Sequence, residues 1–179
     1  MRNKKIRFPA LPLLSVLLLL LLTAGCVFEP YRETAEFDLA VKPVETKQPM
    51  LVLELRNDSS SGVRFRRLTG YRAVGDPYNR WVLPPGELVA RALSLALAGT
   101  GGVPPKVLAG SLDCFEQNVD AGTFRLAGRI GPAGEPPAKW KRFDLSVPVK
   151  GDSAEATAAA ASEAVRRLAA ELAAGNSRP

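Results

Sequence analysis

The sequence predicts a single α+β domain in which two helices pack on one face of a mostly antiparallel sheet. In short segments at 37–42 and 50–56, every second residue is apolar, the period of two that is typical of half-buried strands. Two other segments, an apolar one at 84–98 and an alanine-rich one at 153–174, have helical periodicity. The order along the chain is therefore strands, helix, strands, helix.

Residues 1–25 have the three parts of a bacterial export signal. An apolar stretch from about residue 10 to residue 22 follows the basic residues Arg2, Lys4, Lys5 and Arg7. The stretch ends in Leu22-Thr23-Ala24-Gly25-Cys26, which is typical of a lipoprotein processing site. Cys26 is then the first residue of the mature protein and carries a lipid anchor. An ordinary cleaved signal or a short membrane anchor is the alternative, although the run is shorter than the roughly 20 residues that span a bilayer.

The mature chain divides into a short tether at 26–36 that begins with the lipidated cysteine, a domain at 37–175 and a tail at 176–179. Four of the 24 basic residues and none of the 18 acidic residues lie in the leader. Processing thus leaves 20 basic and 18 acidic residues, a net charge of +2. Because the basic character belongs partly to the leader, the charge gives no indication of nucleic-acid binding.

Within the domain, we expect strands at 37–42, 50–56, 63–74, 107–119, 123–130 and 138–149. In the second of these, Leu51, Leu53 and Leu55 form the apolar set that is expected to face the core. In the third, the alternation slips around Arg67 and Leu68, which predicts a bulge there.

The apolar arc of the helix at 84–98 covers about half of its circumference, which favours deep burial over a partner surface. The helix at 153–174 carries one apolar stripe, which consists of Ala154, Ala158, Ala161, Val165, Leu168 and Leu172. This stripe is short and poor in leucine, so we expect it to pack on the protein's own sheet rather than in a coiled coil.

Little in the composition supports catalysis. The chain has no histidine, which excludes Ser-His-Asp and Cys-His arrangements and the commonest zinc ligand. Once Cys26 is lipidated, Cys114 is the single remaining cysteine, and its apolar neighbours indicate a buried small residue rather than a nucleophile. We therefore expect a protein that is not an enzyme and that has no metal or cofactor.

An aromatic-rich segment at 71–85 precedes the first helix and contains the candidate partner-binding residues Tyr71, Tyr78, Arg80 and Trp81. Aromatic side chains and arginine are enriched in protein interfaces. The alternative is that Tyr78 and Trp81 seal the edge of the sheet over the first helix.

A smaller cluster consists of Trp140 with Lys139, Lys141 and Arg142. This cluster is either a solvated strand face or a patch that touches anionic lipid head groups.

Several of these features occur together in one known family. They are the lipidated Cys26, the run Tyr78-Asn79-Arg80-Trp81 with prolines before a helix, the strand Phe124-Arg125-Leu126-Ala127-Gly128-Arg129-Ile130, and a closing alanine-rich helix. Over most of its mature length the chain resembles the auxiliary lipoproteins of ABC-type lipid transport systems, the PqiC-like family. The resemblance implies a docking role without chemistry, with a periplasmic mammalian cell entry (MCE) domain protein and its permease and ATPase as partners.

By the same resemblance to Gram-negative lipoproteins, Val27 after the lipidated cysteine implies sorting to the inner leaflet of the outer membrane. This hypothesis predicts that alanine at both Tyr78 and Trp81 weakens capture of the MCE partner while the fold survives. The alternative is an LptE-like assembly lipoprotein that binds an outer-membrane barrel protein.

Overall fold

The computed structural model describes residues 31–58, 62–99 and 103–175. The expected signal segment, Cys26 and the tail at 176–179 lie outside these residues. Thr34–Pro179 forms one compact unit, separate from Met1–Glu33. Among the residues that the structure describes, the members of the hydrophobic core lie between Phe37 and Ala173, within this unit. In the described residues, neither helix has the length and hydropathy required to cross a membrane.

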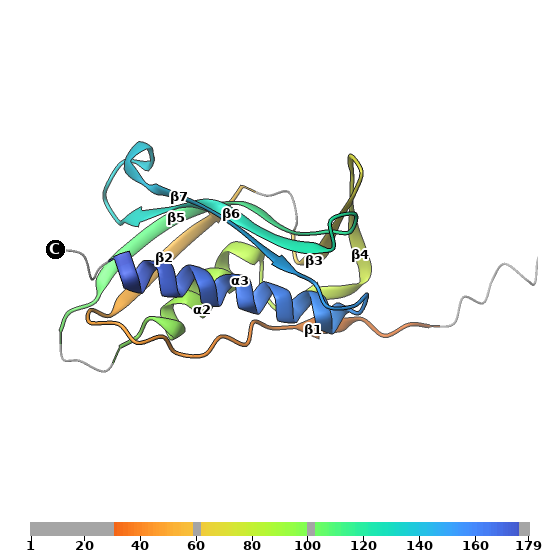
Figure 1. The fold of residues 1–179 in the computed structure, drawn as a ribbon, viewed down its shortest axis with the longest axis horizontal. Coiled ribbons are helices and arrows are strands. Elements are labelled where there is room, and N and C mark those ends of the chain that lie inside the picture. Colours follow the sequence, from red (N-terminus) through yellow and green to blue (C-terminus); the bar gives the residue numbers. More distant parts are fainter. Residues whose placement is uncertain (1–30, 59–61, 100–102, 176–179) are drawn as a thin grey trace, which may run out of the picture. The chain divides into compact units, whose positions relative to one another are not determined.

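The described part of the unit contains a seven-stranded sheet and two α-helices (Figure 1). The strands are β1 (Ala35–Phe37), β2 (Met50–Asn57), β3 (Arg64–Thr69), β4 (Arg72–Trp81), β5 (Lys106–Asn118), β6 (Thr123–Pro132) and β7 (Lys141–Pro148). The helices are α2 (Pro85–Ala96) and α3 (Ala154–Gly175), and a short 3-10 helix, η1 (Pro137–Lys139), precedes β7. The predicted α+β class and both predicted helices are confirmed.

The sheet is mixed, which refines the expectation of a mostly antiparallel one. Its strand order is β1-β4-β3-β5-β6-β7, and β2 pairs with β5. The pairs β3–β4, β5–β6 and β6–β7 are antiparallel, whereas β1–β4, β2–β5 and β3–β5 are parallel. The long strand β5 joins the two halves: β2 pairs with its first seven residues and β3 with Gln117 and Asn118 near its end.

Both helices lie on one face of the sheet (Figure 1). Helix α2 packs on β2 and β5, α3 packs on β6 and β7, and the two helices contact each other. The predicted stripe of α3 faces the sheet, with Ala161 and Val165 fully buried. The burial expected for α2 is found at Leu88, Val89 and Leu93, which have no exposed surface, but not at Leu95, which is 66% exposed.

Helix α2 also covers the edge of β2 that lacks a strand partner. The Ser94 hydroxyl accepts a hydrogen bond from the Val52 N–H at 3.0 Å and donates one to the Val52 carbonyl at 3.3 Å. Gly86 lies so close to β2 that a Cβ atom there would be 2.1 Å from the carbonyl oxygen of Leu55. A side chain and a close helix therefore take the place that a neighbouring strand would otherwise occupy.

The segment between β1 and β2 runs along the helices on the side away from the sheet (Figure 1). The Ala40 N–H donates to the Ser162 hydroxyl of α3 at 3.1 Å, and the Val44 N–H donates to the Ala96 carbonyl of α2 at 2.8 Å. The expected strand at 37–42 is thus shorter than predicted, because its backbone beyond Phe37 bonds to helices instead of a strand. Its apolar residues Leu39 and Val41 nevertheless pack against the core as expected.

The predicted inward set of β2 is wrong at two positions. Met50, Val52 and Leu55 are buried, whereas Leu51 is 40% and Leu53 is 62% exposed. The register shifts between Val52 and Glu54, so that Leu53 is an extra residue without a partner on β5. This bulge changes which parity faces inward.

Candidate partner-binding surface

The structure divides the single strand expected at 63–74 into a hairpin. Strands β3 and β4 are joined by Gly70 and Tyr71, and Thr69 pairs with Arg72. Gly70 has a φ of 55°, the left-handed conformation that glycine supplies in two-residue hairpin turns. The Gly70 N–H donates to the Asp120 carboxylate, and the Val119 N–H donates to the Leu68 carbonyl at 2.9 Å. The tip of the hairpin is therefore held by the turn between β5 and β6.

Asp76 shapes the second half of β4. Its carboxylate accepts hydrogen bonds from the backbone N–H groups of Tyr78 and Asn79 at 2.9 and 3.1 Å, and from the Asn79 side-chain amide at 2.9 Å. The Arg67 guanidinium lies 3.5 Å away. Partial burial raises the pKa of Asp76, but these hydrogen bonds and the charge of Arg67 outweigh burial, and the pKa lies below its usual value. The ionised carboxylate thus holds the local turn that places Tyr78.

The register of the hairpin shifts at this turn. Arg66 pairs with Gly75 and Arg64 pairs with Arg80, so residues 76–79 of β4 lie opposite Phe65 alone. The bulge predicted at Arg67 and Leu68 is wrong, since both residues pair in register with β4. The irregularity lies in β4, whose extra residues face the stretch of β3 between Arg64 and Arg66.

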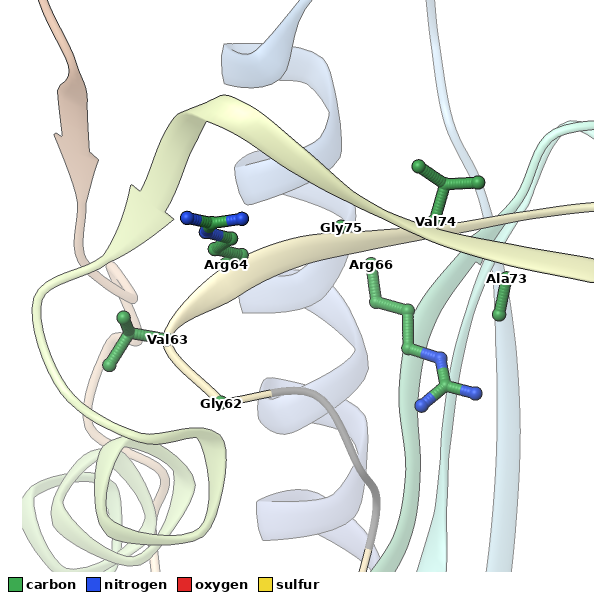
Figure 2. Close-up of a pocket in the computed structure, with 7 residues that line it drawn as sticks. All are labelled: Gly62, Val63, Arg64, Arg66, Ala73, Val74 and Gly75. Carbon is green, nitrogen blue, oxygen red and sulfur yellow. The ribbon is translucent and has the colours of Figure 1, made fainter.

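A cavity of about 380 Å³ opens beside the hairpin. Figure 2 shows its lining residues, which are Gly62, Val63, Arg64, Arg66, Ala73, Val74 and Gly75. The guanidinium groups of Arg64 and Arg66 lie apart in this view. The Nε atom of Arg66 is 2.8 Å from the Glu116 carboxylate, whereas Arg64 has no ion pair with any described residue. Val63, Arg64, Arg66 and Val74 line this cavity, and Tyr71 lies at the hairpin tip. We call these five residues together the hairpin surface.

The four candidate residues do not form one cluster. Tyr71 is completely exposed at the tip of the hairpin, and Tyr78 is half-buried in β4. Arg80 is exposed, and its Nε and Nη2 atoms donate to Glu36 of β1 at 3.0 and 2.5 Å. Arg80 therefore joins β4 to β1, which leaves Tyr71 as the most accessible of the four residues.

Trp81 lies in the core, so its expected role as a partner contact is corrected. It is 2% exposed, and its ring stacks on Phe65 with a centroid distance of 4.1 Å. It also contacts Phe115 at 5.1 Å. For Trp81 the structure agrees with the alternative, in which the side chain is a packing residue. At the end of β4 this side chain lies on the face of the sheet that the helices cover.

Four residues of the hairpin surface were not among the sequence candidates: Val63, Arg64, Arg66 and Val74. Val63 is 36% and Val74 is 49% exposed. Arg64 is one of the polar residues that alternate with apolar ones in β3, so the sequence itself indicates that its side chain faces solvent. The proximity of these residues depends on the turn at Gly70 and on the register shift, which the alternation pattern does not reveal.

The described residues offer little to catalysis or metal binding. No group of three or more Cys, Asp and Glu side chains in this part of the chain is arranged to hold a metal ion. Burial raises the pKa of the Cys114 thiol to about 12, and Glu116 acts in the same direction. At neutral pH Cys114 is therefore a protonated thiol with poor nucleophilicity.

Comparison with known proteins shows a shared fold. No protein-family model and no curated protein matches the chain. One solved structure, described as an uncharacterized protein, is 14% identical and superposes with a TM-score of 0.63 over 81% of this chain and 99% of its own. A second, protein XCC0632 from Xanthomonas campestris of the family DUF330, is 16% identical, with a TM-score of 0.58 over 77% of this chain and 91% of its own. The fold is thus similar to that of a DUF330 protein.

Proposed function

We propose that this protein is a non-catalytic envelope lipoprotein and an accessory subunit of an ABC/MCE-type lipid transport system. Cys26 anchors it in the inner leaflet of the outer membrane, where it faces the periplasm. The hairpin surface docks the periplasmic MCE-domain protein that works with a permease and an ATPase. The observation that carries this proposal is the accessible Tyr71 at the tip of an ordered hairpin that also carries the exposed Arg64, in a fold similar to that of a DUF330 protein.

Two further points support this role. DUF330 corresponds to the PqiC-like family that the sequence resembles. The hairpin surface also combines an exposed tyrosine ring with two guanidinium groups, and tyrosine and arginine are enriched among the residues that dominate binding energy in protein interfaces. Because the carboxylates of Asp76 and Asp120 accept hydrogen bonds from backbone N–H groups and so fix the backbone, docking costs little conformational entropy.

The test is affinity capture of the tagged full chain from crosslinked, detergent-solubilised cells, followed by mass spectrometry. We expect an MCE-domain protein and its permease in the captured material. The combined substitution Tyr71→Ala and Arg64→Ala should reduce this recovery about tenfold. The matched control is Tyr31→Ala with Arg129→Ala, which removes an equally exposed tyrosine and an exposed arginine outside the hairpin.

Each outcome is informative. Equal recovery with the hairpin and control variants would exclude the hairpin surface as the docking site. Recovery of an outer-membrane barrel protein without an MCE protein would overturn the proposal in favour of an LptE-like assembly role. Retention of Cys26→Ser in the membrane fraction to the same extent as the unchanged chain would contradict the lipid anchor.

A further inference from the structure

A second cavity lies at the opposite end of the sheet from the hairpin surface. It has a volume of about 390 Å³, within the range of about 300–1,000 Å³ that is usual for small-molecule sites. It opens where β5 begins, β6 ends and β7 begins, beside the last turns of α3. The hairpin contacts β5 at its other end, near Gln117 and Asn118. We call this cavity the end groove.

The end groove has an apolar floor. The floor residues come from β2, β5, β6, β7 and α3 and are Met50, Leu108, Ile130, Phe143, Leu168 and Leu172. Five of them are at most 6% exposed and are held in the core, while Leu172 is half-buried. The floor is therefore built from the rigid interior, and it gives an aliphatic chain a preformed surface to contact.

The rim of the end groove is mainly basic. Four lining side chains are basic and two are acidic: Lys106, Lys139, Lys141 and Arg142, against Glu135 and Glu171. Lys139 and Lys141 are exposed, and among the described residues neither forms an ion pair. Arg142 is also exposed, so it adds positive charge to the rim beside the two lysines.

We propose that the end groove binds an anionic membrane lipid, with one acyl chain on the apolar floor and the negative head group at Lys139 and Lys141. An apolar floor beside a positively charged rim matches an amphiphile whose charge lies at one end of an aliphatic chain. A free phosphate ion leaves the floor in contact with water, and a neutral hydrocarbon leaves the lysines without a partner. This assignment does not depend on the identity of the protein that docks at the hairpin surface.

Trp140 provides a reporter for binding. It lies between the two lysines in the sequence, and its ring packs on Gly131, a lining residue, so closely that a Cβ on Gly131 would be 2.4 Å from its Cδ1 atom. The other tryptophan, Trp81, is buried among phenylalanines. A fluorescence change that is lost in Trp140→Phe therefore arises at the end groove.

The experiment titrates the unit Thr34–Pro179 with lysophosphatidylglycerol below its micelle concentration and follows Trp140 fluorescence. We expect saturable binding that is about tenfold weaker in Lys139→Glu with Lys141→Glu. The matched control, Lys42→Glu with Lys47→Glu, makes the same charge change at exposed lysines outside the groove and should bind as the unchanged protein does. Lysophosphatidylcholine, which has the same chain and no net charge, should bind about tenfold more weakly.

A floor variant completes the test. Leu172→Asp places a carboxylate on the apolar floor at a half-buried position and should abolish the fluorescence change while thermal unfolding stays cooperative. The proposal fails if no saturable change is seen, if the two double-lysine variants bind equally, or if the two lipids bind equally. Loss of lipid binding with intact MCE capture would leave the docking role standing, so the two proposals are tested separately.

Discussion

Trp81 stacks on Phe65 with ring centroids 4.1 Å apart and an angle of 26° between the ring planes. The contact joins the last residue of β4 to the β3 residue that lies opposite the register shift. The aromatic chain continues on both sides, from Phe37 through these two rings to Phe115 and Phe124, with centroid distances between 4.9 and 5.1 Å. This row of packed aromatic rings therefore lies in the core behind the β3–β4 hairpin.

Replacement of Trp81 by alanine should destabilise the protein by about 3–5 kcal/mol, because it leaves a cavity between Phe65 and Phe115. Urea unfolding of the unit Thr34–Pro179 measures this loss. Tyr71→Ala is the control, since its exposed side chain should contribute less than about 0.5 kcal/mol. Similar stabilities for the two variants would contradict the core position of Trp81.

Substitution of Gly86 by alanine should destabilise the protein by about 1–3 kcal/mol, although alanine is the better helix former. The added methyl group would lie 2.1 Å from the Leu55 carbonyl oxygen, so α2 would have to move away from β2. Thermal unfolding measures the effect. At Gly62, where no atom lies within 4 Å of the added Cβ, alanine should be tolerated, and equal losses at the two sites would argue against this close approach.

Acidification should weaken the hairpin through Asp76. Its folded-state pKa is lowered, so its contribution to stability is present above about pH 4 and is lost as the pH falls through the folded-state pKa. Urea unfolding at several pH values should therefore show a shallower loss of stability below about pH 4 in Asp76→Asn than in the unchanged protein. Asp152→Asn, which removes an exposed carboxylate before α3, controls for net charge. Parallel pH profiles for Asp76→Asn and the unchanged protein would show that the carboxylate does not hold this turn.

Cys114 should react slowly with thiol reagents in the folded protein. Burial holds its pKa near 12, so only a very small fraction is thiolate at pH 8. Alkylation by iodoacetamide, followed by mass spectrometry, should proceed at least about tenfold faster in urea than in native buffer. Comparable rates would place the thiol in solvent.

The helices were the most predictable part of the fold. In α3 the stripe from Ala158 to Leu168 fixes one buried face, and Gly151 and Gly175 lie near its ends. Helix α2 begins at Pro85, as its sequence indicates. Its apolar arc is broad because the helix contacts the sheet, α3 and the segment at 38–49. Periodicity was sufficient here because helical hydrogen bonds are local.

The strands were harder to predict because their neighbours are distant in the sequence. In β2 both parities are apolar, so nothing local distinguishes Leu53 from Val52, and only the bulge decides which of them is buried. Similarly, no sequence pattern shows that β2 and β3 run parallel to the same edge of β5. Half of the strand pairings are parallel for this non-local reason.

The candidate surface was predicted in part. Tyr71 is accessible as expected, but Trp81 belongs to the core because the register shift at residues 76–79 sets which face of β4 it occupies. The end groove could not be derived from sequence, since its floor brings together residues as far apart as Met50 and Leu172. Most basic residues of its rim could be recognised in the sequence as the cluster around Trp140. The apolar floor next to them could not.

The position of β5 has a consequence for the order in which the domain assembles. Strand β2 pairs with β5 alone, across more than 50 residues, and the β3–β4 hairpin joins the rest of the sheet through the end of the same strand. A chain that emerges from its N-terminus can form the hairpin early, but β2 has no strand to join until β5 is present. Closing such long loops is entropically costly and slow. We therefore expect the sheet to be completed only after β5 is present, and the apolar residues of β2 and α2 to stay exposed to aggregation until then.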